Sequence, residues 1–386
     1  MKELFARRRT LILKRGKERV VANRHPWIFA GAIHADHGPE DAAFADLVDS
    51  GGARLASGFY SKHSQIRLRA LTFGEELTEE LIASRIAGAI ARRRPIFDEG
   101  TNAARLIHAE GDELSSIVAD RYGDVIVVEI ANRGAEHIKS LVIDVLQREL
   151  APRAIFFRND LPARRLEKLP TEEEEIAPAM ILESGLKFRV DAAGGQKTGF
   201  FLDQRENRRL ARSLAAGRRV LNLFSYTGAF GVYAAAGGAA SARNVDVSAR
   251  AIELAAENHA LNGLPGEQTV ADAFQFVRAT DERYDFVICD PPAFAKSRND
   301  VERAARGYKD VNLYAMKLVA PGGMMMTFSC SGHMPLDLFQ KVIFAAALDA
   351  GRRVSFVRRL GAGPDHPVSL FAPEGEYLKG FLLEVH

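Results

Sequence analysis

The sequence predicts an α/β protein whose C-terminal half is a mostly parallel sheet, preceded by a β-rich part and a small α+β part. After residue 196, strand patterns alternate with helix patterns to the end of the chain, which is typical of parallel strands joined by crossover helices. The first 72 residues instead contain short apolar runs separated by glycines, as small β-rich domains do. Between these parts, two helix patterns lie among strand patterns.

Length and composition indicate a folded chain of several domains. At roughly 150 residues per domain, the 386 residues predict two or three domains. Hydrophobic residues make up 47% and charged residues 26%, which excludes global disorder and fibrous repeats. The formal net charge of +2 does not by itself indicate a nucleic-acid partner.

Basic charge is concentrated at the N-terminus. Nine of residues 2–24 are Lys or Arg and two are acidic. Such a stretch is either a solvated, fraying terminus or, beside Trp27 and Phe29, a surface that faces RNA. Both interpretations are open at the level of the sequence.

Cysteine usage and hydropathy indicate the cell compartment. Cys289 and Cys330 are the only cysteines, too few for a disulfide framework and not at the spacing of metal ligands, so no metal site is expected. No run of about 18 apolar residues and no signal peptide occur, so we expect a cytoplasmic protein without a membrane partner.

The predicted elements follow from periodicity and from turn residues. Helices are expected over 79–94 and 136–150 in the middle part. The last two strands are expected to form an antiparallel hairpin at the edge of the sheet. The predicted strands are 116–119, 125–130 and 154–158 in the middle part, and 220–224, 242–246, 267–270, 286–289, 324–329, 353–360 and 377–385 in the C-terminal part.

Strand ends of the C-terminal part predict a cofactor site. A glycine-containing turn, 224–228, follows the first strand, at the sheet edge where open α/β folds bind ligands. Asp246 ends the next strand, where a carboxylate accepts ribose hydroxyls, and Asp272 ends the third, where it suits an adenine amino group with Phe274 packed on the ring. The expected cofactor contacts are Phe224, Ser225, Tyr226, Thr227, Gly228, Asp246, Asp272, Ala273, Phe274, Asp290 and Pro291.

Two nucleotide-binding motifs are missing from the sequence, and their absence restricts the class of ligand that this site would bind. Neither the dinucleotide fingerprint nor the P-loop is present, so an adenosine ligand without phosphates, S-adenosyl-L-methionine, fits best. The alternative is that strand-end glycines and aspartates are turn residues and helix caps. Three successive acidic strand ends favour the site.

Two further strand ends carry candidate catalytic groups. Asp290 follows the fourth strand, and the two prolines after it fix its backbone. Cys330 ends the fifth strand, whereas Cys289 lies inside an apolar strand and is interpreted as a packing residue. A thiolate that adds to C6 of cytosine makes C5 nucleophilic, so Cys330 suits a nucleophile and Asp290 the group that holds the base edge and N3. The target base must be flipped out, with Phe294 and Phe200 as candidate stacking partners.

Several motifs resemble one family. The chain contains QKTGFFLDQR (196–205), FSYTG (224–228), DPP (290–292), RGYKD (306–310), FSCSG (328–332) and YLKGF (377–381). Together they closely resemble the bacterial large-subunit rRNA cytosine-5 methyltransferases of the rRNA large subunit methyltransferase I family. HPWIF (25–29) resembles the entry to that family's RNA-binding PUA domain.

The resemblance implies three domains, which are a PUA domain over 1–72, a central α+β domain over 73–190 and a class I Rossmann-like methyltransferase domain over 191–386. It implies Cys330 as the nucleophile, Asp290 as its acidic partner, S-adenosyl-L-methionine as the cofactor, large-subunit rRNA as the partner, and a homodimer as one oligomeric state. Some RNA cytosine-5 methyltransferases have a second cysteine where Pro292 stands here, so the base that removes the C5 proton is not identified. The expected substrate-binding residues are Lys197, Phe200, Asp203, Gln204, Pro292, Phe294 and Lys309.

Two other functions are compatible with the sequence. Asp-Pro-Pro also occurs in methyltransferases that act on amino nitrogens, so guanine N2 or adenine N6 of RNA is an alternative target, with Cys330 then structural. A non-catalytic RNA-binding or assembly factor is the second alternative, which the run of strand-end acids disfavours. The loop 110–116 departs from the glycine- and proline-containing turn of the family, which bears on this loop of the middle domain and on RNA docking but not on the catalytic assignment.

Overall fold

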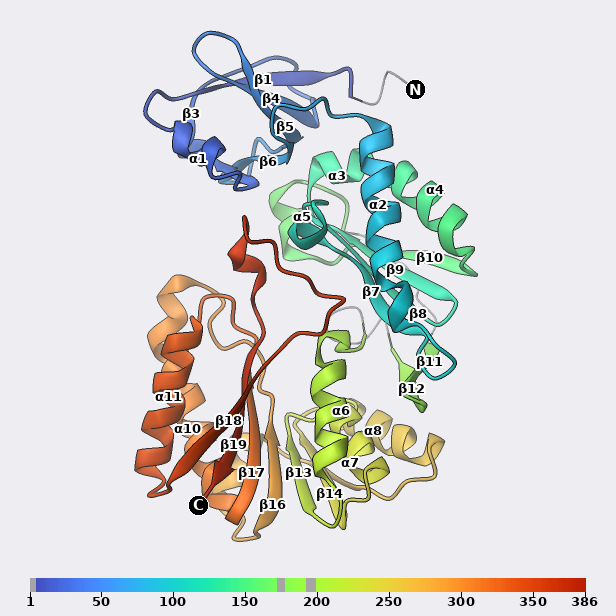
Figure 1. The fold of residues 1–386 in the computed structure, drawn as a ribbon, viewed down its shortest axis with the longest axis vertical. Helices are drawn as coiled ribbons and strands as arrows, with labels where there is room; N and C mark the ends of the chain where they lie inside the picture. Colours follow the sequence, from blue (N-terminus) through green and yellow to red (C-terminus); the bar gives the residue numbers. More distant parts are fainter. Residues whose placement is uncertain (1–4, 172–177, 192–198) are drawn as a thin grey trace. The chain divides into compact units, whose positions relative to one another are not determined.

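The computed structural model describes residues 5–171, 178–191 and 199–386, and the chain packs into two compact units. The N-terminal unit comprises Met1–Ala179, Val190–Phe200 and Asp365–Gly375, and the C-terminal unit comprises Met180–Arg189, Phe201–Pro364 and Glu376–His386. Both units are drawn in Figure 1, where colour follows the sequence. No helix in the described ranges is long and apolar enough to cross a membrane.

The β-rich part expected at the start of the chain is confirmed as a six-stranded sheet in the order β2-β6-β5-β4-β1-β3. Its core contains the buried side chains of Leu11, Ile28, Leu47 and Leu68. The elements are β1 (Arg8–Leu13), α1 (Glu18–Ala22), β2 (Trp27–Phe29), β3 (Ile33–His37), β4 (Phe44–Val48), β5 (Arg54–Tyr60) and β6 (Ile66–Thr72).

Two of the basic residues near the start of the chain, Arg8 and Arg9, lie in β1 of this sheet. β1 pairs with β3 on one side and with β4 on the other. Arg8 Nη1 lies 3.0 Å from Asp46 Oδ1, and Arg9 makes an ion pair with Asp36. A fraying terminus is therefore wrong for β1, because its arginines are held by carboxylates of neighbouring strands. The proposed RNA-facing role of this region stays a prediction.

The middle part is a four-stranded sheet in the order β10-β9-β8-β7, with α2 packed against β7 and α4. The helix expected over 136–150 is two helices, because the backbone of Ile138 (φ −100°, ψ 14°) leaves helical geometry and ends α3. The elements are α2 (Glu79–Arg93), β7 (Ala103–His108), β8 (Ile117–Tyr122), β9 (Val125–Ile130), α3 (Arg133–His137), α4 (Lys139–Leu150), β10 (Ala154–Arg158) and α5 (Pro162–Leu166).

The six-stranded and four-stranded sheets share one hydrophobic core. Phe44 and Phe59 of the first sheet pack in the same cluster as Ile82 of α2 and Val142 of α4. A Cβ at Gly134 in α3 would lie 2.6 Å from a ring carbon of Phe59, so glycine is required for this close approach. The two parts are one body, and the predicted boundary near residue 72 stays a prediction.

The segment Asp365–Gly375 packs in the same unit although it lies between the last two strands of the other. Asp365 Oδ2 accepts a hydrogen bond from the Arg105 backbone N–H (3.0 Å), and its carbonyl accepts one from Arg93 Nη2 (2.9 Å). A Cβ at Gly111 would lie 2.0 Å from the Pro367 carbonyl oxygen. The loop 110–116, which departs from the family pattern, is thus a docking point for this segment.

The C-terminal unit has the predicted seven-stranded sheet, in the order β15-β14-β13-β16-β17-β19-β18. β19 is antiparallel to both neighbours, which confirms the predicted terminal hairpin. The elements are the hairpin β11 (Ala179–Glu183) and β12 (Leu186–Val190), then α6 (Arg205–Leu214), β13 (Arg219–Leu223), α7 (Ala229–Ala236), β14 (Ser241–Asp246), α8 (Ala249–Leu261), β15 (Glu267–Val270), α9 (Ala273–Ala279), β16 (Tyr284–Cys289), α10 (Val301–Leu318), β17 (Val319–Ser329), α11 (Leu336–Asp349), β18 (Val354–Gly361) and β19 (Lys379–Val385).

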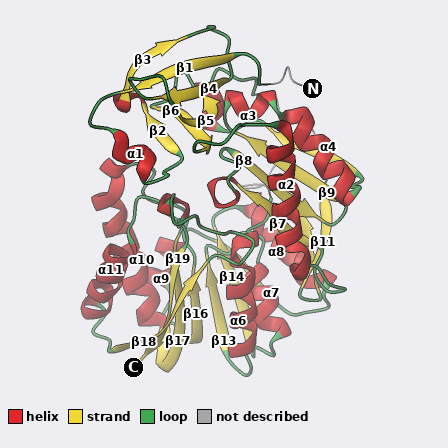
Figure 2. Cartoon of the chain, turned by 45° about the horizontal axis from the view of Figure 1, so that its top comes forward, coloured by secondary structure: helices red, strands yellow, loops and turns green. Residues whose placement is uncertain are grey.

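Helices cover both faces of this sheet, as Figure 2 shows for α6 and α7 on one side and α10 and α11 on the other. Alternate residues of β16 point to opposite faces. Val287 and Cys289 pack in the cluster that includes Tyr308 of α10, whereas Phe286 and Ile288 pack in the cluster that includes residues of α6 and α7. The continuous apolar run of this strand reflects burial on both faces.

We expect His108 to make the protein less stable in mild acid. Burial lowers the pKa of His108 to about 3, and the Arg105 charge and His366 add to this effect. In the unfolded chain a histidine titrates near pH 6.5, so between pH 6.5 and 4.5 the unfolded state binds a proton that the folded state does not, and stability falls as the pH falls. The free energy of unfolding is measured by urea titration at both pH values. Its decrease between pH 6.5 and 4.5 should be about 2 kcal/mol smaller in the His108→Gln variant than in the wild-type protein.

The matched control is His37→Gln, at an exposed position of β3, which should leave the pH dependence unchanged. Equal losses in the wild-type protein and in the His108→Gln variant would contradict the assignment.

Candidate active site

The predicted site residues meet at one edge of the sheet in the C-terminal unit. In the parallel ladders, Leu223 pairs with Val245 and with Cys289, and Cys289 pairs with Thr327. The carboxyl ends of β13, β14, β16 and β17 therefore lie side by side, and the segments that follow them form the edge at which such sheets bind ligands.

The turn after β13 has a strained backbone. Phe224 (φ 56°), Tyr226 (φ 48°) and Gly228 (φ 74°) are all left-handed, a conformation that non-glycine residues adopt rarely. A Cβ at Gly228 would lie 2.7 Å from Ala255 Cβ, so only glycine fits there. Strain of this kind concentrates where backbone must approach a ligand.

Asp246 orients this turn. Its Oδ2 accepts a hydrogen bond from the Tyr226 N–H (2.9 Å), and its Oδ1 accepts one from the Ser248 N–H (2.9 Å). Ser248 Oγ caps α8 by accepting from the Ala251 N–H (3.2 Å), as its sequence position predicts. A carboxylate has about four lone-pair sites, so the two backbone bonds leave Asp246 able to accept ribose hydroxyls, and that role stays a prediction.

Asp272 is also a helix cap. Its Oδ1 accepts a hydrogen bond from the Gln275 N–H (3.0 Å) at the start of α9. The Phe274 ring, two residues on, lies 6.0 Å from the Phe224 ring and 5.8 Å from the Phe294 ring between centroids. Aromatic rings thus join the turn after β13 to the segment after β16, while the contact of Asp272 with adenine stays a prediction.

The buried hydroxyls of Ser225 and Thr227 indicate whether the residues at this edge fit S-adenosyl-L-methionine. Ser225 and Thr227 are 7% and 2% exposed, and neither hydroxyl has a hydrogen-bond partner within the described ranges. Leaving such groups unsatisfied is unfavourable, and the cofactor's amino, carboxylate and ribose groups would satisfy them. With Asp246 and the aromatic rings, the donor and acceptor set fits an adenosine ligand with a charged amino-acid end.

Gln204 and Asp290 are brought together. Gln204 Nε2 donates a hydrogen bond to Asp290 Oδ2 (2.9 Å). Gln204 Oε1 accepts in turn from Asn207 Nδ2, which also donates to the Gly361 backbone carbonyl (2.9 Å). The start of α6 therefore fixes the orientation of the carboxylate that follows β16.

Asp203 connects the same segment to the last hairpin. The Tyr377 hydroxyl donates to Asp203 Oδ2 (2.6 Å), and the Gly363 N–H donates to the Asp203 carbonyl (3.0 Å). Both partners lie in the connection between β18 and β19. Asp203 thus has a structural contact at this edge, and its contact with substrate stays a prediction.

Cys330 lies at the edge next to the segment that carries Asp290. Its Sγ is 3.8 Å from the Pro291 carbonyl oxygen. Ser331 Oγ accepts a hydrogen bond from the Ala295 N–H (3.1 Å) and lies 2.9 Å from the Tyr308 hydroxyl. These contacts join the segments after β16 and β17, so the cysteine has a fixed position.

The two cysteines differ in environment. Cys289 is fully buried, and this burial, with the charge of Asp290 adding, raises the pKa of its thiol. Cys330 is only partly buried. Of the two, Cys330 is the thiol that a ligand at this edge can reach.

Lys379 is a residue that the sequence analysis did not select. It lies opposite Ser329 in the β17–β19 ladder, is 4% exposed, and its Nζ donates to the carbonyls of Ser331 (3.0 Å) and Glu376 (3.3 Å). Burial lowers the pKa of Lys379, opposed by the charges of Glu376 and Cys330. The signal was a lysine at the start of a C-terminal strand in which Glu384 is the only other charged residue.

Of the remaining expected substrate contacts that the structure describes, Pro292 and Phe294 follow β16 at this edge, whereas Lys309 and Phe200 have other packing partners. Lys309 Nζ makes an ion pair with Asp349 Oδ2 (2.6 Å) at the end of α11. Phe200 is buried and packs with the N-terminal unit, and Lys197 lies outside the described residues. Phe294 packs on Tyr308, with 4.6 Å between ring centroids, and Pro292 is exposed at the edge.

Family comparisons agree with this fold. Residues 156–377 match the model of the S-adenosylmethionine-dependent methyltransferases, and residues 11–73 match that of a PUA-like domain. A methyltransferase from Streptococcus mutans has the same fold, with a TM-score of 0.81 at 22% identity over 97% of this chain and 99% of that one. The protein is therefore an S-adenosylmethionine-dependent methyltransferase of class I architecture with a PUA-like domain.

Full-length relatives define the family more narrowly. The ribosomal RNA large subunit methyltransferase I of Shewanella denitrificans is 43% identical over 97% of this chain and 98% of its own length. The protein of the same name from Serratia proteamaculans is 41% identical over 97% and 99%. The chain belongs to the ribosomal RNA large subunit methyltransferase I family.

We expect Asp246→Asn to weaken cofactor binding. In this variant, an amide NH2 group replaces one acceptor oxygen of Asp246 and faces a backbone N–H. The substitution also removes the negative charge that would accept hydrogen bonds from the ribose hydroxyls. Isothermal titration calorimetry with S-adenosyl-L-methionine should show a dissociation constant raised by roughly ten- to hundredfold. Asp285→Asn is a matched control, because Asp285 accepts from the Arg219 N–H (2.9 Å) at the start of β16, and its affinity should be unchanged. Wild-type affinity of the Asp246→Asn variant would refute the ribose assignment.

Proposed function

We propose that the protein methylates C5 of a cytosine in large-subunit rRNA through a covalent bond between Cys330 and C6 of the base. The observation that carries the proposal is the position of the Cys330 thiol, 3.8 Å from the Pro291 carbonyl and beside Asp290, at the ligand-binding edge of a methyltransferase sheet. The relatives named for ribosomal RNA large subunit methylation support rRNA as the substrate.

A nucleophile is needed because cytosine C5 is a poor nucleophile. When the Cys330 thiolate adds to C6, the ring becomes an enamine whose C5 carries the electrons. When bound, S-adenosyl-L-methionine supplies the electrophilic methyl group that C5 accepts. Loss of the C5 proton to a base then restores the double bond between C5 and C6, and the thiolate of Cys330 leaves.

Asp290 has the complementary role of holding the base. Addition at C6 is easier when N3 accepts a proton or a strong hydrogen bond, and a carboxyl group fixed at the edge can supply it. Gln204 holds one oxygen of Asp290, and Pro291 and Pro292 restrict the backbone that follows. The geometry is therefore organised before the base arrives.

Lys379 is the positioning residue for the thiolate in this proposal. Its buried ammonium makes no ion pair with a carboxylate in the part of the chain that the structure describes, and an isolated buried charge is unfavourable. Its Nζ is held on the carbonyl of Ser331, the residue after Cys330. A neighbouring cation favours a thiolate over a thiol, so each charge stabilises the other.

Cytosine methylation is tested by mass spectrometry of nucleosides. Large-subunit rRNA from a strain that lacks the protein is incubated with the enzyme and S-adenosyl-L-methionine. We expect 5-methylcytidine as the product, and Cys330→Ala should lower its rate of formation by roughly a thousandfold or more while cofactor binding is retained. Cys289→Ala is the matched control, and it should retain activity because Cys289 only packs in the core.

A covalent trap separates the competing mechanisms. In RNA that contains 5-fluorocytidine, C5 carries no removable proton after methyl transfer, so the adduct to Cys330 should accumulate and be absent in Cys330→Ala. Full activity of the Cys330→Ala variant would refute the covalent mechanism. N2-methylguanosine or N6-methyladenosine as the product would instead identify an amino-nitrogen methyltransferase.

We further expect Lys379→Met to lower the reactivity of Cys330. Loss of the nearby cation reduces the thiolate fraction of Cys330. Alkylation of Cys330 by iodoacetamide at pH 7, measured by peptide mass spectrometry, should therefore slow by about tenfold. Lys379→Arg keeps the charge and should retain most of the reactivity. Equal rates in the two variants would show that Lys379 has only a packing role. A cytoplasmic location and a homodimer stay predictions.

A further inference from the structure

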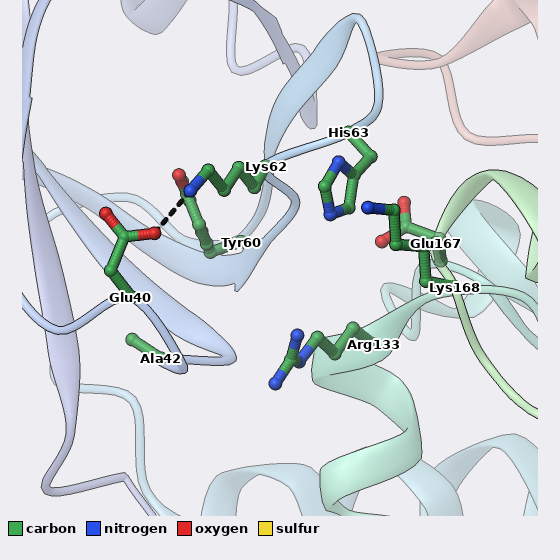
Figure 3. Close-up of a pocket in the computed structure, with 8 residues that line it drawn as sticks. All are labelled: Glu40, Ala42, Tyr60, Lys62, His63, Arg133, Glu167 and Lys168. Carbon is green, nitrogen blue, oxygen red and sulfur yellow. Dashed lines mark hydrogen bonds and ion pairs between the residues drawn. The ribbon is translucent and has the colours of Figure 1, made fainter.

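A second polar site lies in the N-terminal unit, at the seam between the six-stranded sheet and the middle part. It is a cavity of about 240 Å³. One wall comes from the sheet and carries Tyr60, Lys62 and His63, and the other carries Arg133 at the start of α3 and Lys168 just after α5. Figure 3 shows these side chains around one space.

The cavity has an excess of positive charge. Its two carboxylates already have cations, because Glu40 pairs with Lys62 and Glu167 Oε1 lies 3.8 Å from Arg69 Nη1. The side chains of Arg133, His63 and Lys168 make no hydrogen bond or ion pair with any residue that the structure describes. Converging cations without a protein counter-charge are the usual composition of an anion site.

Lys168 stands at a helix end where glycine is the favoured residue. Lys168 (φ 54°) is left-handed and occupies the position after the cap of α5, where its N–H donates to the Arg165 carbonyl (3.2 Å) and the Leu169 N–H donates to the Arg164 carbonyl (2.9 Å). Glycine is the favoured residue at this position of a Schellman motif. A lysine there is conformationally less favourable than a glycine.

The start of α3, which carries Arg133, is held by buried contacts. Asn132, fully buried, caps α3 by accepting from the Gly134 N–H (2.8 Å). Gly134 allows α3 to pack closely against Phe59 and the Ala43 carbonyl. A Cβ at position 134 would lie within 2.7 Å of both. Arg133 stands between these two fixed residues, so its backbone cannot shift relative to β5.

We propose that this cavity binds a backbone phosphate of the RNA substrate. The inference rests on the proposed function for the identity of the RNA. The Arg133 guanidinium presents paired donors to phosphate oxygens, while Lys168 on the same wall and His63 on the wall formed by the sheet contribute further donors. Phosphate contacts of this kind position an RNA without reading its sequence, and here both parts of the N-terminal unit would hold the same strand.

The test uses Lys168→Gly, which separates a binding role from a structural one. Glycine relieves the left-handed backbone, so the thermal midpoint should rise, whereas the affinity for in vitro transcribed large-subunit rRNA should fall several-fold. Because one phosphate contact is lost, the slope of log K against log of KCl concentration should decrease by about 1. Arg133→Ala should give the same loss of affinity and of slope.

The matched control is Arg148→Ala, which removes an exposed arginine on α4 of the same unit and should leave both quantities unchanged. Wild-type affinity and slope in Lys168→Gly and Arg133→Ala would overturn the proposal, as would an equal loss in Arg148→Ala. A loss of inorganic phosphate binding with unchanged rRNA binding would also overturn it, because the ligand would then be a free anion.

Failure of this proposal is distinguishable from failure of the proposed function. Formation of 5-methylcytidine by the wild-type protein, with unchanged rRNA affinity in the cavity variants, refutes only the phosphate site. A different methylated nucleoside, with lowered rRNA affinity in these variants, refutes only the cytosine assignment and supports the site.

Discussion

The parallel pairing of β16 with β17 is the constraint on which the candidate active site depends. Because Cys289 is paired with Thr327 in the ladder, the residues just beyond the two strands, Asp290 and Cys330, emerge at the same edge. Hydrogen bonds of the Ser331 side chain then join the segments that follow β16 and β17, and they fix the distance between these segments. Groups 40 residues apart in sequence become neighbours through backbone register.

Several charged groups are paired inside the molecule. The Arg208 guanidinium makes two hydrogen bonds to the buried carboxylate of Glu183 (2.7 and 2.8 Å), which joins α6 to β11, and Arg93 does the same with Asp112 (2.7 Å for both). Removing one partner of such a pair leaves an uncompensated buried charge. The near-zero net charge is therefore a sum over different environments. Some arginines are paired with carboxylates inside the molecule, and an excess of cations lies at the cavity beside Arg133.

Secondary structure was largely readable from the sequence because apolar periodicity and turn residues are local signals. The bounds of β9, β10 and β15 match the prediction, and α2 differs by one residue. The break at Ile138 was missed because the apolar spacing continues through it. Strand-end acids predicted the edge of the site, yet Asp272 is a helix cap and Lys309 pairs with Asp349, which spacing alone does not distinguish from ligand contacts.

The sequence by itself determined the order of elements, the class of sheet and the candidate nucleophile, since each is encoded in residues close together along the chain. Only the tertiary structure decided which side chains accompany them. Gln204 holds Asp290, Lys379 lies by the carbonyl after Cys330, and Lys168 lines the same cavity as Arg133. These contacts join residues 35 to 86 positions apart, through strand pairing and helix packing that no local pattern specifies.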